Sequence, residues 1–132
     1  MCGQQSDHKR QWRDYQTKNG ARPIKDFLLA LPDEDRAAIL TEMEHVREHG
    51  TSIARHLHKD IYEARTIYNT KAYRILFACE GRFHHVLLAL DGFQKKTQQT
   101  PRAHIKLAEQ RLADWRQRGK DKRVSQENER QT

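Results

Sequence analysis

Charged side chains in two stretches of the chain are spaced so that they could bind a phosphate group. In IYEART, Glu63 and Arg65 are two residues apart, so both side chains lie on one face if this stretch is a strand. Arg65 is then a candidate phosphate ligand, and Glu63 a candidate base or orienting partner; an ordinary ion pair is the structural alternative. Arg74 begins the apolar part of AYRILFA, where a buried charge without a function would be costly. We treat Arg74 as a further candidate, with a pairing to Asp91 or Glu63 as its structural alternative.

Two adjacent lysines, Lys95 and Lys96, follow Phe93 at the end of another apolar stretch. A loop after a strand can present both ammonium groups to one groove. Neighbouring positive charges lower the pKa of a lysine, so one of the two could act as a general base while the other contacts phosphate. The pattern does not choose between them, and a solvated basic loop is the alternative. Phe93 either stacks on an unpaired base or belongs to the core.

The histidines and cysteines form no pattern typical of a metal site. His56 and His58 flank a leucine without a third ligand nearby, and Cys2 and Cys79 lie far apart and outside any CxxC motif. We therefore expect no metal, no cofactor and no disulfide framework.

The charge of the chain points to a polyanionic partner. The net charge is +7 over 132 residues, and the stretch 94–123 carries ten Lys or Arg against three acidic residues. Such a balance favours nucleic acid or an anionic membrane surface. In the last predicted helix, Arg102, Lys106 and Arg111 are expected to bind RNA phosphates. No run approaches the roughly 20 apolar residues of a membrane span, and no signal peptide is recognisable, so we expect a cytoplasmic protein without a membrane partner.

The elements that must position these residues predict an α+β domain. Apolar periodicity and turn residues indicate the order strand, helix, helix, three strands, helix. The expected ranges are 11–17, 23–31, 33–49, 61–68, 72–79, 82–93 and 101–118. We expect the first two helices to pair as a hairpin, the turn at 80–82 to make an antiparallel meander, and the helices to cover one face of the sheet.

The ends of the chain are polar and lack periodicity. We expect a disordered tail at 1–10, a folded domain at 11–118, and a disordered basic and polar tail at 119–132.

Five stretches, in this order, resemble one known family. They are WRDYQTKNGARPIKDFLLALP, HLHKDIYEAR, AYRILFA, LALDGFQKKTQQTP and IKLAEQRLADW, and they cover roughly residues 11–118. GFQKKTQQTP is the most specific of them, followed by the pairing of YEAR with YRILF. On these motifs the chain resembles the HigB-like, phage-derived killer proteins of the RelE/ParE toxin superfamily.

The resemblance implies a RelE-like fold and the toxin of a type II toxin–antitoxin system. It implies a ribosome-dependent mRNA endoribonuclease that halts translation, with the ribosome, mRNA and a HigA-like helix-turn-helix antitoxin as partners. Metal-independent cleavage needs a deprotonated 2′-hydroxyl, a protonated leaving oxygen and cations that neutralise the phosphate. Arg74 matches the arginine of the family's YR motif, which commonly touches the scissile phosphate. Arg65, Glu63, Lys95 and Lys96 complete the expected catalytic set.

The sequence departs from well-studied relatives at TPRAHIK, which offers no tyrosine where some of them place a catalytic one. The identity of the general base is therefore open. Two alternatives remain: a ParE-like inhibitor of DNA gyrase without nuclease activity, and a noncatalytic RNA-binding module.

Overall fold

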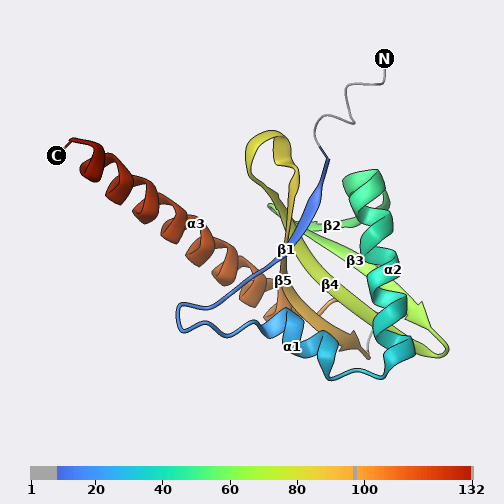
Figure 1. The fold of residues 1–132 in the computed structure, drawn as a ribbon. Helices are drawn as coiled ribbons and strands as arrows, with labels where there is room; N and C mark the ends of the chain where they lie inside the picture. The colour runs from blue at the N-terminus through green and yellow to red at the C-terminus, as the bar shows by residue number, and fades with distance from the viewer. Residues whose placement is uncertain (1–8, 97, 132) are drawn as a thin grey trace, which may run out of the picture.

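A five-stranded sheet with helices on both faces forms the body of the molecule in the computed structural model, which describes residues 9–96 and 98–131, the last eight of these by their backbone only (Figure 1). In chain order the elements are β1 (Gln11–Asp14), α1 (Pro23–Leu29), α2 (Asp33–His49), β2 (Arg55–His58), β3 (Ile61–Tyr68), β4 (Lys71–Glu80), β5 (Val86–Lys95) and α3 (Arg102–Gln131). Two short 3₁₀ helices, Gly50–Ile53 and Arg82–His84, lie between them.

The sheet has the order β1-β5-β4-β3-β2. The three pairings among β2, β3, β4 and β5 are antiparallel, as expected for the meander, whereas β1 pairs with β5 in parallel. The mixed α+β class is compatible with the RelE-like fold. No described helix combines the length and apolar character that crossing a bilayer would require.

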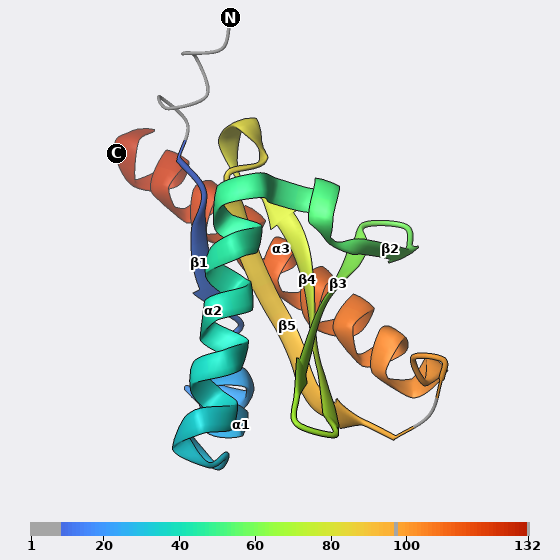
Figure 2. The same ribbon diagram turned by 90° about the vertical axis from the view of Figure 1, so that its right-hand side faces the viewer.

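The helices occupy opposite faces of the sheet, which corrects the expectation of one covered face. In Figure 2, α2 lies in front of the strands and α3 passes behind them. The predicted hairpin of the first two helices is not shown either, because α1 packs mainly on β5 and α2 mainly on β3. Both helices bury their apolar stripes against the sheet instead of against each other.

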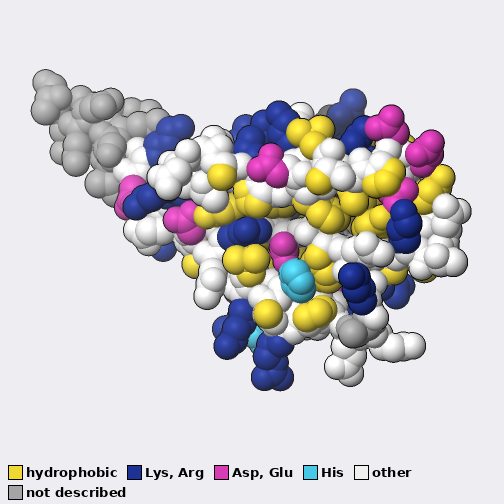
Figure 3. All heavy atoms as spheres, turned by 90° about the horizontal axis from the view of Figure 1, so that it is seen from below, with side chains coloured by type: hydrophobic (Ala, Val, Ile, Leu, Met, Phe, Trp, Pro, Cys, Tyr) yellow, Lys and Arg dark blue, Asp and Glu magenta, His cyan; other side chains and the backbone are white. Residues whose placement is uncertain are grey.

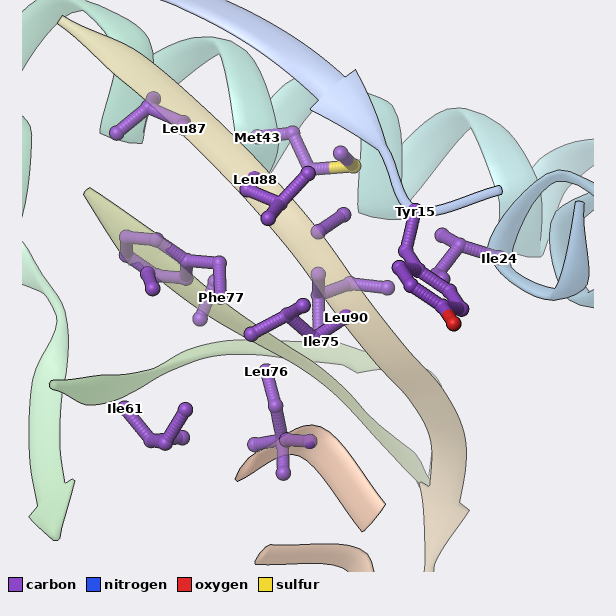
Figure 4. Close-up of a cluster of buried hydrophobic side chains, with 14 of the residues drawn as sticks. Tyr15, Ile24, Met43, Ile61, Ile75, Leu76, Phe77, Leu87, Leu88 and Leu90 are labelled. Carbon is purple, nitrogen blue, oxygen red and sulfur yellow. The ribbon is translucent and has the colours of Figure 1, made fainter. Parts of the chain in front are cut away.

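Alternation along β4 decides which residues meet which helix. The Tyr73 hydroxyl donates to Asp35 in the first turn of α2, and the Tyr73 ring lies 6.4 Å from that of Phe27 in α1. Arg74, the next residue, therefore points to the face that α3 covers. Figure 4 shows the core on both sides: Met43 extends from α2, while Leu76 points toward α3. The sheet thus separates a face packed by α1 and α2 from a second face, packed by α3, that holds Arg74.

Several boundaries differ from the expected ones. Strand β1 ends at Asp14 and not at residue 17. Strand β2 falls within the predicted loop, because its sequence RHLH offers no apolar alternation. The β4–β5 connection is longer than a tight turn, and Phe83 and His84 in it have φ angles of 61° and 56°. Helix α3 continues to Gln131, where a disordered tail is expected after residue 118. The residues after Gly119 are mostly good helix formers, and one glycine costs a helix only about 1 kcal/mol. Residues 1–8 of the expected first tail, and Thr132, lie outside the described residues.

Gly92 lies at a close contact between β5 and α1. A Cβ atom there would lie 2.6 Å from Cδ2 of Phe27 and 3.1 Å from Cδ1 of Ile75. We expect Gly92→Ala to lower the free energy of unfolding by about 1–3 kcal/mol, measured by urea denaturation, because the extra methyl overpacks this contact. Gly119→Ala is the matched control, since its Cβ meets no described atom within 4 Å. Equal stability of both variants would contradict the close packing.

Candidate active site

A row of mostly charged residues crosses β3, β4 and β5 on the face beneath α3. The charged row consists of Glu63, Arg65, Arg74, Phe93 and Lys95. Arg65 pairs with Arg74 across β3 and β4, and Arg74 pairs with Phe93 across β4 and β5. Directly opposite residues in antiparallel strands share a face and lie about 5 Å apart. Glu63, two residues before Arg65, lies on this face as well, because it accepts a hydrogen bond from Thr100 just before α3. The shared face predicted for Glu63 and Arg65 is therefore confirmed.

Glu63 and Arg74 form a buried pair of opposite charge at the centre of this row. The Glu63 side chain is fully buried, and that of Arg74 is 9% exposed; Arg74 Nε lies 3.4 Å from Glu63 Oε1. Neither of these two atoms has a hydrogen-bond partner among the described residues, although Arg74 Nη1 donates to the Tyr73 carbonyl at 3.0 Å. Burial lowers the pKa of Arg74 although the charge of Glu63 raises it, and the charges of Arg65 and Arg55 lower it further. The pair keeps hydrogen-bonding capacity that its own geometry does not use.

The structure distinguishes the two lysines that the sequence could not rank. Lys95 ends β5 two residues after Phe93, on the same face, and only 8% of it is exposed. Lys96 follows the strand and is exposed. Burial lowers the pKa of Lys95, and the positive charge of Arg74 lowers it further. Of the two, Lys95 has the environment of a lysine that can lose its proton.

His104, which the sequence analysis did not single out, lies against this row. It belongs to the first turns of α3, and its ring stacks on Phe93 with centroids 3.7 Å apart and an angle of 11° between the planes. Its Nδ1 lies 2.6 Å from Asp91 Oδ2. The sequence signal for the surroundings of His104 is the period of two along β5, which places Asp91 and Phe93 on the same face as Lys95. The contact with His104 depends on how α3 is docked.

Phe93 and the cations of α3 differ in how far their side chains are exposed. Phe93 is buried, and His104 covers one face of its ring, so that face is not open to a base. Arg102 and Lys106 are exposed. Arg111 is half-buried: it donates to the Leu90 carbonyl at 2.7 Å, which ties α3 to β5.

An open hollow of about 740 Å³ lies at the loop before α3. It is lined by Gln98, Gln99, Thr100, Pro101, Arg102 and Ile105. Thr100 lines the hollow and also donates a hydrogen bond to Glu63, so this residue connects the hollow with the charged row. Figure 3, viewed from below, shows Lys and Arg side chains in several groups on this side of the molecule, with hydrophobic and acidic side chains between them. The cations among them offer separate contacts to a polyanion.

No group of three or more His, Cys, Asp or Glu side chains that could hold a metal ion occurs within the described residues. The chemistry that this face can supply with its own residues is phosphate binding and proton transfer by a lysine or a histidine.

One family model matches the chain. A family model described as phage derived protein Gp49-like (DUF891) matches residues 26–113, which include the whole charged row. The match covers most of the chain, so the chain belongs to this family, which is of the RelE/HigB-like toxin type. None of the curated proteins matches the chain significantly.

Proposed function

We propose that this chain, as a member of the Gp49-like family of RelE/HigB-like toxins, is a HigB-like mRNA endoribonuclease that acts on the ribosome without a metal ion. The observation that carries the proposal is the row of cations at Arg65, Arg74 and Lys95 around the buried carboxylate of Glu63. Cations fixed before the reaction begins stabilise the charge that develops on a phosphate in the transition state.

Each member of the row has a distinct role in this proposal. Arg65 and Arg74 bind the scissile phosphate, and Glu63 holds Arg74 in place. Lys95, whose pKa is lowered by burial and by Arg74, takes the proton from the attacking 2′-hydroxyl. Lys96 is exposed beside it and contacts a neighbouring phosphate.

The cations of α3 and the binding partners complete the proposal. Arg102 and Lys106 are exposed on α3 and bind phosphates of the message or of ribosomal RNA. Arg111, which is half-buried against β5, adds its charge. A toxin of this type is paired with an antitoxin, which we propose to be a HigA-like helix-turn-helix protein. Because the target is the translating ribosome, the protein acts in the cytoplasm.

The test is in vitro translation of a defined message, with primer extension to map new 5′ ends in the presence and absence of ribosomes. Wild-type protein is expected to cut within codons only when ribosomes are present. Arg74→Ala is expected to slow cutting by about 10²–10³-fold, because a fixed phosphate ligand is lost. Lys25→Ala, an exposed cation on α1 across the sheet, is the matched control and should cut like wild type.

Arg74→Ala leaves Glu63 buried without its partner, so circular dichroism must show that the variant is folded. Arg65→Ala removes an exposed member of the row and is the second variant. Message that stays intact with and without ribosomes would overturn the proposal. Induced DNA damage would then point to gyrase, and salt-sensitive RNA binding without cleavage to a binding module.

A further inference from the structure

His104 is held in one orientation by two contacts made by different chemical groups. Its ring lies flat on Phe93, and its Nδ1 is 2.6 Å from Asp91 Oδ2. A carboxylate only accepts hydrogen bonds, so Nδ1 carries the proton of this contact. The imidazole therefore directs Nε2 away from Asp91, and the side chain as a whole is 34% exposed. A histidine oriented by a carboxylate in this way is suited to proton transfer at its second nitrogen.

The same contacts fix where His104 stands relative to the charged row. Asp91, Phe93 and Lys95 follow one another on one face of β5, with about 6–7 Å between successive members. Arg74 lies directly opposite Phe93 on β4. Lys95 therefore lies beyond Arg74 toward one end of β5, whereas His104 lies over Phe93 and bonds to Asp91 toward the other end. Cleavage needs a base and an acid on opposite sides of the phosphorus.

We propose that His104 is a catalytic residue of the proposed ribonuclease: it is the general acid that protonates the leaving 5′-oxygen. The inference rests on the proposed function and deepens it. The 2′-oxygen gives its proton to Lys95 and forms a bond to phosphorus, while the bond between phosphorus and O5′ breaks. The electron pair of that bond goes to O5′, which takes the proton of His104 Nε2. The products are a 2′,3′-cyclic phosphate and a 5′-hydroxyl, and charge and protons balance.

The groups around His104 support this direction of transfer. Asp91 bonds to Nδ1 and stabilises the imidazolium, and Arg111 Nη1 lies 3.8 Å from Asp91 Oδ1 on the other side of the carboxylate. The charged residues nearest to Phe93, on which the ring stacks, are Arg74 opposite it on β4, with its partner Glu63, and Lys95 two residues further along β5. The proton of Nε2 passes to O5′ as negative charge develops there.

The test compares two messages that differ in one atom. One carries the ordinary 5′-oxygen at the cleaved position, and the other carries a 5′-sulfur there, because a thiolate leaves without being protonated. The variant is His104→Phe, which keeps an aromatic ring against Phe93 but carries no proton for transfer. His45→Phe, at an exposed histidine of α2, is the matched control and should cut both messages like wild type.

His104→Phe is expected to cut the oxygen message about 10²–10⁴-fold more slowly and the sulfur message at close to the wild-type rate. Equal slowing of both messages would overturn the role of His104 and leave the proposed function intact. Failure of the wild-type protein to cut either message on the ribosome would overturn the proposed function, and this inference with it. Thermal melting of both variants checks that the Phe93 contact is preserved.

Discussion

Lys95→Arg is expected to slow cleavage of ribosome-bound message by about 10²–10⁴-fold at neutral pH, although it keeps the positive charge. An arginine does not give up its proton in a protein, whereas burial and the charge of Arg74 lower the pKa of Lys95. If Lys95 takes the proton from the 2′-hydroxyl, the arginine variant binds the message but cannot start the reaction. Single-turnover rates from primer extension give the measurement.

Lys96→Arg is the matched control, because it makes the same change at the exposed neighbour. It should cut like wild type. Lys95→Met removes both the charge and the base. It is a second variant that does not place a larger side chain in the buried position. Full activity of Lys95→Arg, with loss only in Lys95→Met, would show that Lys95 contributes charge and no proton transfer.

The pH dependence of the wild-type rate follows from the same assignment. The active form of Lys95 is the neutral amine, so its titration gives the rising limb of the pH–rate profile, and loss of the proton from the general acid gives the falling limb. Because the pKa of Lys95 is lowered, the rising limb should lie at lower pH than for an ordinary lysine. Arg55 is one of the charges that lower this pKa, so Arg55→Ala should move the rise toward higher pH.

The parts of the site that could be predicted from sequence depend on short-range periodicity. The period of two along a strand was enough to place Glu63 and Arg65 together, and the charge of Arg74 in an apolar stretch was enough to mark it. The choice between Lys95 and Lys96 was out of reach, because it depends on which lysine the folded chain buries. The roles of all these residues stay predictions until cleavage is measured.

The parts that were missed depend on contacts between distant segments. His104 looked like an ordinary helix residue, because its partners Asp91 and Phe93 lie on another element and meet it only when α3 is docked. The parallel pairing of β1 with β5 joins residues near 12 and 87, and no local pattern encodes it. The family resemblance covered both regions but carried no information on this histidine.

The Glu63–Arg74 pair carries the second large effect, which is on stability. Glu63→Met is expected to lower the free energy of unfolding by about 3–5 kcal/mol, because it leaves the Arg74 guanidinium buried without an opposite charge. Urea denaturation monitored by circular dichroism gives the measurement. Glu44→Met is the matched control: its pair with Arg47 is exposed, so the denaturation midpoint should hardly move.

The double variant Glu63→Met/Arg74→Met separates stability from function. Replacing both members of a buried ion pair by apolar side chains is often neutral or stabilising, so the double variant should recover most of the stability lost in Glu63→Met. It should nevertheless cut message at least as slowly as Arg74→Ala, because the phosphate ligand is gone. A double variant as unstable as the single one would contradict the idea that an unpaired Arg74 causes the loss. Recovery of stability without activity would instead mean that the chain keeps a buried arginine beneath α3 for its ligand, since the fold itself does not require one.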